Sequence, residues 1–162
     1  MVELSPSYSW SKGDTFHRTT SRGVKEMSIY QHLIVYLASM VLFLLIDFAW
    51  LGWVAKPFYH RQAGALLSPQ VNWPAAIAFY LMYVIGLLVF CTLPALAHGS
   101  LASAMGWGAL YGFFTYATYE LTNYALLKNW PAALVPVDIA WGVILCSLVA
   151  AGGYWVGQGL IR

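Results

Sequence analysis

The chain has 162 residues and a net charge of +2; 60% of its residues are hydrophobic, 17% are aromatic and only 9% are charged. A soluble globular domain carries about 25% charged residues, so this composition excludes an ordinary soluble protein and indicates an integral membrane protein. The sequence has no Gly-rich phosphate loop, no paired zinc-binding histidines, no serine elbow and no basic stripe, so we expect no nucleic-acid partner, and no cofactor is evident.

Residues 1–26 differ from the rest of the chain. They are rich in Ser and Thr, carry charges of both signs and show no helical apolar stripe, which predicts a disordered tail or an extension. Met27 then begins the functional domain, residues 27–162. With this beginning, Lys and Arg are concentrated in the first and third connections, and the positive-inside rule places both termini outside the cell. The cations of the tail reverse this preference if the tail is retained.

Four apolar runs follow, and each is long enough to cross a bilayer. A hydrocarbon core about 30 Å thick needs roughly 20 apolar residues per helix. The predicted spans are residues 33–54, 75–96, 101–127 and 132–156. We therefore predict an all-α, polytopic protein built as a four-transmembrane-helix bundle in the plasma (inner) membrane of a bacterium, with the lipid bilayer as its partner. Cys91 and Cys146 fall inside these runs and are interpreted as small packing residues.

The first connection, residues 56–69, reads "KPFYHRQAGALLSP". Its apolar residues predict a segment that lies along the membrane surface, and a lid over a pocket is the alternative. The predicted apolar contacts of this segment are Phe58, Tyr59, Leu66 and Leu67.

The pentapeptide "NWPAA" precedes both the second and the fourth span, at residues 72–76 and 129–133. Asn favours the N-cap position, Trp the membrane interface, and Pro the first helical turn. Each copy therefore predicts a helix that begins at headgroup level. Because the second and fourth spans run in the same direction, both beginnings lie on one face of the membrane.

Small residues recur four apart on the third and fourth spans, as Gly108 with Gly112 and Gly153 with Gly157. This spacing permits close contact between helix backbones. We predict packing contacts rather than hinges at these positions.

Three carboxylic acids interrupt the apolar runs, and their depths in the membrane coincide. Asp47 lies nine residues before Lys56, Asp138 lies nine residues after Asn129, and Glu120 lies eight residues before Lys128. At 1.5 Å per helical residue, all three lie roughly 12 to 14 Å below the same membrane face. A purely structural role, through hydrogen bonds between helices, gives no reason for this common level.

Polar residues in membrane spans usually face the interior, and the acids have aromatic or amide neighbours three or four residues away or at the same depth. We predict a polar pocket lined by these neighbours and open toward the face that carries the first and third connections. Its candidate catalytic residues are Asp47, Glu120 and Asp138. Its candidate ligand-binding residues are Trp50, Tyr80, Tyr83, Tyr116, Asn123, Tyr124 and Trp141.

No Lys or Arg lies within the predicted spans, although an ionised carboxylate near mid-bilayer costs about 2.5 to 3.5 kcal/mol on insertion scales. Either some of the acids are protonated at neutral pH, or water reaches them, or they hold a cation. The sequence leaves the question of a metal open.

Three functions are compatible with such a pocket. The first is a carrier or binder for a proton, a small cation or a small solute, which requires a homo-oligomer because four helices form only a thin conduit. The second is a membrane-embedded acid/base enzyme that acts on a lipid or isoprenoid-like substrate, with Trp and Tyr rings around that substrate. The third is a non-catalytic assembly subunit whose polar layer fixes only its own fold.

Several stretches resemble a known family, the bacterial predicted membrane proteins grouped as domain of unknown function 2177. The similarity runs from about Tyr30 to Tyr154 and is carried by "IDFAWLGWVAKPFY", "AFYLMYVIGLLVF", "GALYGFFTYATYELTNYALLKNWP" and "VDIAWG". The resemblance implies a small polytopic membrane protein and supplies no activity. The residues that match the family motif are Asp47, Glu120, Asn123, Trp130, Pro131, Asp138 and Trp141. At Glu120 the family pattern more often has Asp, so this carboxylate reaches one methylene further and fits a strict metal geometry slightly less well.

Overall fold

The computed structural model describes residues 27–64 and 70–162, and every regular element in these ranges is a helix. The all-α prediction is thus confirmed for the described part of the chain. The predicted tail, residues 1–26, and two predicted contacts of the first connection, Leu66 and Leu67, lie outside the described residues.

The helices follow one another in chain order as long rods joined by short connections. The first rod consists of α1 (Ile29–Ala49) and the π-helical segment η1 (Trp50–Val54), and the short helix α2 (Lys56–Ala63) follows it. The second rod consists of α3 (Trp73–Leu87), the π-helical segment η3 (Leu88–Thr92) and α4 (Leu93–His98). Two long helices, α5 (Leu101–Leu126) and α6 (Leu134–Ile161), complete the order.

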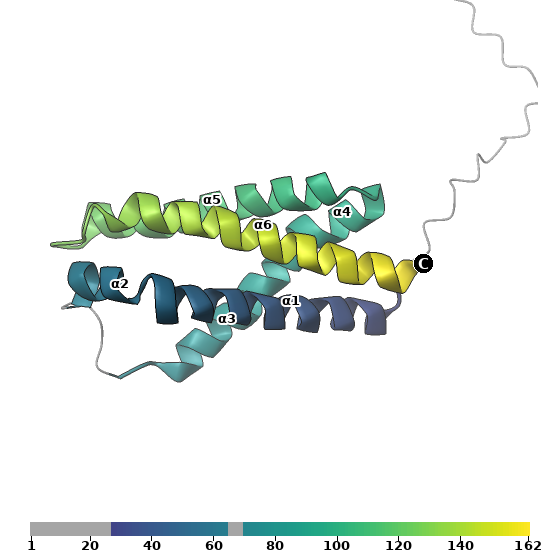
Figure 1. The fold of residues 1–162 in the computed structure, drawn as a ribbon, viewed down its shortest axis with the longest axis horizontal. Coiled ribbons are helices and arrows are strands. Elements are labelled where there is room, and N and C mark those ends of the chain that lie inside the picture. The colour runs from purple at the N-terminus through teal and green to yellow at the C-terminus, as the bar shows by residue number, and fades with distance from the viewer. Residues whose placement is uncertain (1–26, 65–69) are drawn as a thin grey trace, which may run out of the picture.

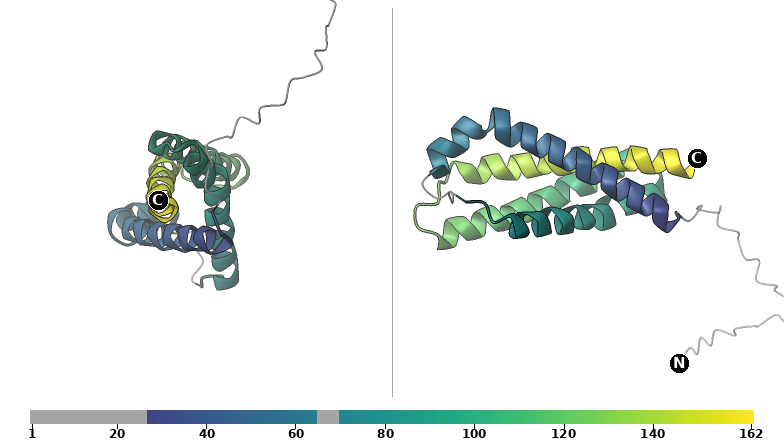
Figure 2. Two further views of the ribbon diagram at one scale, coloured as in Figure 1. Left: turned by 90° about the vertical axis from the view of Figure 1, so that its right-hand side faces the viewer. Right: turned by 90° about the horizontal axis from the view of Figure 1, so that it is seen from below.

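The rods run nearly side by side, except that the first half of α3 turns away from the others (Figure 1). They surround a shared interior when seen along the long axis (Figure 2).

Three helical rods in the described part of the chain are long and apolar enough to cross a membrane, namely Ile29–Val54, Trp73–His98 and Leu134–Ile161. The 26-residue helix α5 is not one of them, because Ser, Thr, Gly and Tyr lower its hydropathy. Three of the four predicted spans are therefore confirmed. The last one is also longer than predicted, since α6 continues to Ile161 instead of ending at residue 156.

A capping box fixes the beginning of α1. Ser28 Oγ accepts the N–H of Gln31 at 3.3 Å, and the N–H of Ser28 donates to Gln31 Oε1 at 2.8 Å, so two helix-end donors are satisfied reciprocally. The same Gln31 side chain donates through Nε2 to the carbonyl oxygen of Leu160 at 2.8 Å. This bond ties the beginning of α1 to the end of α6, and both lie at one end of the structure (Figure 1).

The two copies of "NWPAA" form different structures. Asn72 is the N-cap of α3 and accepts the N–H of Ala75 through Oδ1 at 3.3 Å, as predicted. The prediction is wrong for the second copy, because α6 begins only at Leu134 and has no side-chain cap. Asn129 instead adopts a left-handed φ of 62° in the turn after α5, a conformation that Asn tolerates better than most residues. Reversal of the chain after α5 therefore determines the role of this Asn.

Both π-helical segments stand just before a proline. η1 ends three residues before Pro57, and η3 ends two residues before Pro94. Proline donates no N–H, and its ring crowds the carbonyl group four residues earlier, which belongs to Trp53 in η1 and to Phe90 in η3. We attribute the widened turns to this crowding.

The most extensive contact between elements joins α5 and α6. A Cβ atom added to Gly112 would overlap the carbonyl oxygen of Gly142, and one added to Gly108 would also meet the backbone of α6. Cβ atoms at Gly153 and Gly157 would crowd side chains of α1, η3 and α4. The predicted packing role of both glycine pairs is confirmed, because only Gly allows these close approaches.

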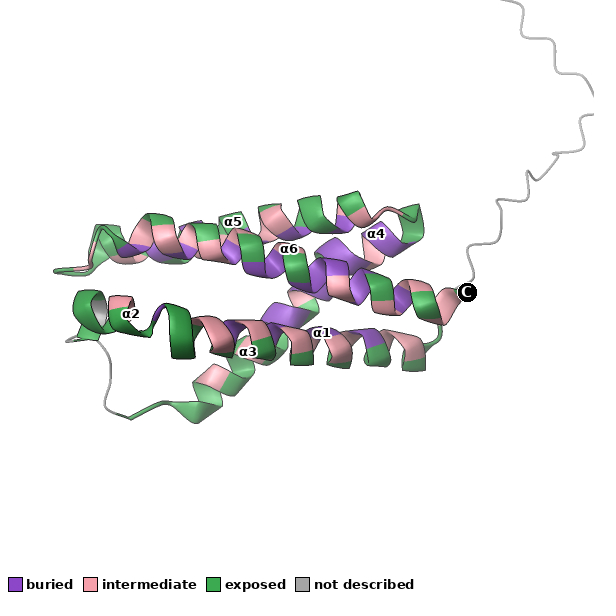
Figure 3. Cartoon of the chain, in the orientation of Figure 1, coloured by how far each residue is buried: buried purple, intermediate pink, exposed green. Residues whose placement is uncertain are grey.

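The interior and the outer faces differ as expected for a protein surrounded by lipid. Cys91 and Cys146 are free and buried in the interior, in agreement with their interpretation as packing residues. Large apolar side chains point outward, among them Trp53, which is 85% exposed, and Trp155, which is 66% exposed. Exposed positions alternate with buried ones along the long helices (Figure 3). Exposure of this much apolar surface is favourable in a bilayer and costly in water.

Candidate functional site

The three acids of the apolar helices are buried in the part of the structure that carries α2 and the turn between α5 and α6. Glu120 is 0% exposed, and Asp47 and Asp138 are each 7% exposed. They lie on α5, α1 and α6 respectively, near the end of each helix that shares this side (Figure 1). The structure thus brings acids from three helices into one region, and we call Asp47, Glu120 and Asp138 the carboxyl cluster.

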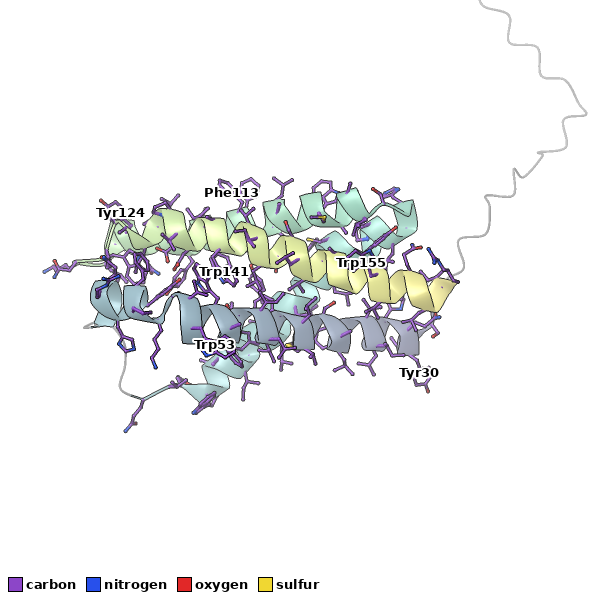
Figure 4. All side chains as sticks on the ribbon, in the orientation of Figure 1. Tyr30, Trp53, Phe113, Tyr124, Trp141 and Trp155 are labelled. Carbon is purple, nitrogen blue, oxygen red and sulfur yellow. The ribbon has the colours of Figure 1, made fainter. Side chains whose placement is uncertain are left out.

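Aromatic donors from two other helices hold Asp47. The Tyr80 hydroxyl donates to Oδ2 at 3.1 Å, and the Trp141 indole N–H donates to Oδ1 at 3.3 Å. The Trp141 ring stacks on Trp50 with centroids 4.3 Å apart and planes 8° apart, and it lies between α6 and α1 (Figure 4). Trp141 lies three residues after Asp138 on the same helix, and this spacing predicts a contact between the two. The structure shows that the Trp141 indole instead donates to Asp47 on the neighbouring helix.

Glu120 and Asp138 form the other part of the cluster. The Trp130 indole donates to Glu120 Oε2 at 2.9 Å, and the Tyr59 hydroxyl donates a short hydrogen bond to Asp138 Oδ1. The two carboxyl groups are close enough to interact with each other, and a hydrogen bond between them requires a proton on one of them. Glu120 Oε1 is buried and has no hydrogen-bond donor among the described residues. A fully buried acid thus has one unsatisfied oxygen beside a second acid.

Neutral groups supply the hydrogen bonds that orient the cluster. The donors are Tyr59, Tyr80, Trp130 and Trp141, which position the carboxyl groups without neutralising a negative charge. Within residues 27–64 and 70–162, no group of three or more His, Cys, Asp and Glu side chains is arranged to hold a metal ion. The acids therefore do not converge on one point, and Asp47 stays apart from the pair of Glu120 and Asp138.

Two hydrogen-bond donors to the acids, Tyr59 and Trp130, were not among the candidate pocket residues. Tyr59 was predicted only as an apolar contact of a surface segment, whereas its hydroxyl reaches Asp138. Burial raises the pKa of Tyr59 and the contact with Asp138 raises it further, so the hydroxyl stays protonated and remains a donor. This hydrogen bond ties the short helix α2 to the cluster. Trp130 was indicated only by the family resemblance.

Replacing Tyr59 with Phe is expected to loosen α2 while the rest of the protein stays folded. The ring is kept, and only the hydrogen bond to Asp138 is lost; hydrogen bonds to acidic groups contribute about 1.5 to 3 kcal/mol. Amide hydrogen exchange over residues 56–63 is expected to accelerate roughly tenfold or more, since 1.4 kcal/mol corresponds to a factor of ten. Tyr124→Phe is the matched control, because Tyr124 is 52% exposed, and should leave exchange unchanged. Equal exchange in both variants would show that Tyr59 does not anchor α2.

A cavity of about 360 Å³ adjoins the carboxyl cluster on the side of α3 and α5. It is lined by Phe79, Tyr83, Thr115, Tyr116 and Tyr119. The Tyr83 hydroxyl and Thr115 Oγ1 share a hydrogen bond of 2.8 Å at its wall. The Tyr116 hydroxyl lies within electrostatic reach of both Asp47 and Asp138. Tyr116 therefore lies between the cavity and the carboxyl cluster.

The candidate ligand-binding residues are distributed over these two regions, with one exception. Trp50, Tyr80 and Trp141 surround Asp47, Tyr83 and Tyr116 line the cavity, and half-buried Asn123 lies beside Tyr119. Tyr124 is the exception, because it points outward at the end of α5 (Figure 4). Nearly all residues of this last helical turn are exposed, so sharing a helix face with Glu120 does not bring Tyr124 to the pocket.

The helices and their buried acids define the class of protein, a helical integral membrane protein whose environment is the lipid bilayer. The chain belongs to the family described as predicted membrane protein (DUF2177), whose family model matches residues 32–155. The matched range includes the whole carboxyl cluster and confirms the resemblance identified from the sequence. No curated protein and no solved structure matches the chain.

Proposed function

We propose that this protein is a membrane-embedded carrier or binder whose carboxyl cluster takes up a proton, a small cation or a small solute. Glu120 carries the proposal, because it is 0% exposed, its Oε1 has no donor among the described residues, and it lies beside Asp138. A proton placed between Glu120 and Asp138 supplies the missing hydrogen-bond donor. The same proton removes one of two adjoining negative charges.

The electrostatic setting of the cluster supports uptake of positive charge. An ionised carboxylate near mid-bilayer costs about 2.5 to 3.5 kcal/mol on insertion scales. Within the described ranges, the groups that interact with Glu120 from other elements are Asp138 on α6, Trp130 in the turn before α6 and Tyr59 on α2, and none of them is cationic. Lys56 and Lys128, which flank the same end, are exposed. A proton or cation therefore offsets a cost that the neutral donors leave in place.

The proposal includes α5 as a fourth membrane span. α5 packs along α6, one of the helices suited to cross a membrane, and a helix of its 26 residues is about 39 Å long. That length exceeds a hydrocarbon core of about 30 Å. A four-helix unit of this kind in the plasma membrane forms a thin conduit, so transport requires a homo-oligomer.

Infrared difference spectroscopy of the protein in lipid, from about pH 5 to 9, tests the proposal. The wild type is expected to show a protonated carboxyl band at pH 7 that disappears in Glu120→Gln and shifts in frequency in Asp138→Asn. Asp47→Asn is the matched control and should keep the band, because Asp47 has its own two donors. If all three acids titrate like solvated carboxylates, the proposal fails. Uptake that depends on a pH gradient across vesicles then separates a carrier from a binder.

A membrane-embedded acid/base enzyme for a lipid or isoprenoid-like substrate is the second candidate. The observation that favours it is the aromatic cavity of about 360 Å³ beside the acids. Two acids held in different protonation states supply a general acid and a general base. Such an enzyme converts its substrate in detergent, where no gradient exists, whereas a coupled carrier moves solute only across a closed membrane.

A further inference from the structure

The cavity beside the carboxyl cluster has aromatic walls on several sides. The Phe79 and Tyr83 rings are 5.3 Å apart with planes at 45°, and the Tyr83 and Tyr116 rings are 6.4 Å apart with planes at 85°. Tyr119 completes the aromatic lining. Rings at such angles enclose a space instead of stacking on one another. The face of an aromatic ring attracts a cation that lies within about 6 Å of its centroid.

The cavity opens sideways, between α3 and α5. Phe79 and Tyr119 at its rim are 45% and 56% exposed. α5 contacts η3 and α4, whereas the first half of α3 leans away from the other helices (Figure 1). An apolar molecule in the bilayer therefore reaches the cavity between α3 and α5 without crossing an aqueous face.

The inner wall of the cavity lies against negative charge. The Tyr116 hydroxyl is within electrostatic reach of Asp47 and Asp138, and that of Tyr119 is within reach of Glu120 and Asp138. The Tyr116 ring packs directly on Gly142, where a Cβ atom would overlap it, so the backbone of α6 fixes this wall. Among the described residues, the hydrogen-bond donors of the acids are all neutral and do not cancel their negative charge.

We propose that this cavity binds a lipophilic organic ammonium ion, which enters from the bilayer between α3 and α5. The proposal rests on the function proposed above, since the ammonium group is the positive charge that the carboxyl cluster takes up. The aromatic walls hold the ammonium group, the acids behind Tyr116 and Tyr119 attract it, and the open side accommodates its apolar substituents. The volume of about 360 Å³ falls within the range of roughly 300 to 1,000 Å³ that small-molecule sites occupy.

Two probes of the same shape test the role of charge. Phenyltrimethylammonium and its uncharged carbon isostere, tert-butylbenzene, are titrated calorimetrically into the protein in maltoside detergent, with empty micelles as the blank. The ammonium probe is expected to bind at least about tenfold more tightly. Equal affinity of the two probes, or binding of the neutral one alone, overturns the proposal in favour of a purely apolar groove.

A pair of variants at the rim tests the aromatic walls. Tyr119→Leu is expected to weaken binding of the ammonium probe about three- to tenfold, the range of a single cation–π contact, and to leave the neutral probe unaffected. Tyr119→Phe keeps the ring and should bind like the wild type. If Tyr119→Leu binds the ammonium probe as tightly as Tyr119→Phe does, the aromatic recognition is wrong.

The two proposals fail in distinguishable ways. A protein that loses its infrared carboxyl band in Glu120→Gln but binds neither probe keeps the proton carrier and overturns the ammonium site. The protein could also bind the ammonium probe selectively while all three acids titrate like solvated carboxylates. The ammonium site would then not depend on the buried cluster, and the inference would be overturned, because it rests on that cluster.

Discussion

Gly112→Val is expected to destabilise the protein by about 3 kcal/mol or more and to separate α5 from α6 locally. A Cβ atom at Gly112 overlaps the carbonyl oxygen of Gly142, and a backbone group cannot rotate away as a side chain can. Overpacking of a tight core usually costs about 1 to 3 kcal/mol, and Val adds two methyl groups beyond the overlapping Cβ. Thermal unfolding in detergent, followed by circular dichroism, measures the loss.

Gly106→Val is the matched control for this substitution. Gly106 lies on the same helix, and a Cβ atom there meets nothing within 4 Å, so both variants change helix propensity equally and only Gly112→Val adds a clash. Similar melting temperatures for the two variants would mean that α5 and α6 are not in backbone contact. The same contact sets the register of Glu120 against Asp138, so Gly112→Val is also expected to remove the infrared carboxyl band.

The sequence predicted the helices well where length and hydropathy act together. Continuous apolar runs identified the three rods that are long and apolar enough to cross a membrane. The glycine spacing predicted close packing at Gly108 and Gly112, and the structure shows that α6 is the partner. The third predicted span, α5, is less apolar than the other rods for two reasons: Gly108 and Gly112 lie against α6, and Thr118, Tyr119 and Thr122 are exposed on other faces of the helix. Local pattern alone does not reveal such pairing between helices.

The repeated "NWPAA" shows where local pattern fails. Identical residues cap a helix at Asn72 but form a left-handed turn at Asn129. The first copy begins nine residues after the last helical position of α2, Ala63. The second copy follows α5 within three residues of its last helical position, Leu126, so the chain must reverse at once. The reversal directs Trp130 toward Glu120, a contact that no helical spacing predicts.

The candidate site was predicted by depth more successfully than by helix face. Counting residues along each helix gives the depth of a residue in the membrane, and equal depths predicted that Asp47, Glu120 and Asp138 lie in one region. Donors were harder to assign, because each hydrogen bond to these acids comes from a different element: Trp141 serves Asp47 on another helix, and Tyr59 approaches from a connection. Such choices depend on tertiary packing, which a single sequence does not record.

Glu120→Met is expected to keep or raise the stability of the protein, by up to about 2 kcal/mol, while it abolishes the infrared carboxyl band. Met is similar in length to Glu and fills the same buried space. The substitution removes an oxygen that lacks a donor, and such an unsatisfied buried group costs about 1 to 3 kcal/mol. It also relieves the contact between two acids. The loss of the hydrogen bond from Trp130 opposes these gains by about 1 kcal/mol.

Asp47→Leu provides the comparison. Both oxygens of Asp47 accept hydrogen bonds, from Tyr80 and Trp141, so its removal leaves two donors unpaired and is expected to cost about 2 kcal/mol or more. A non-catalytic assembly subunit, whose polar layer serves only its own fold, predicts that both variants lose stability alike. A stable Glu120→Met protein without the carboxyl band would instead mean that the chain retains a buried acid at the expense of its own stability. Natural proteins accept such a cost mainly where activity requires it, and this outcome would therefore place Glu120 in the function of the protein.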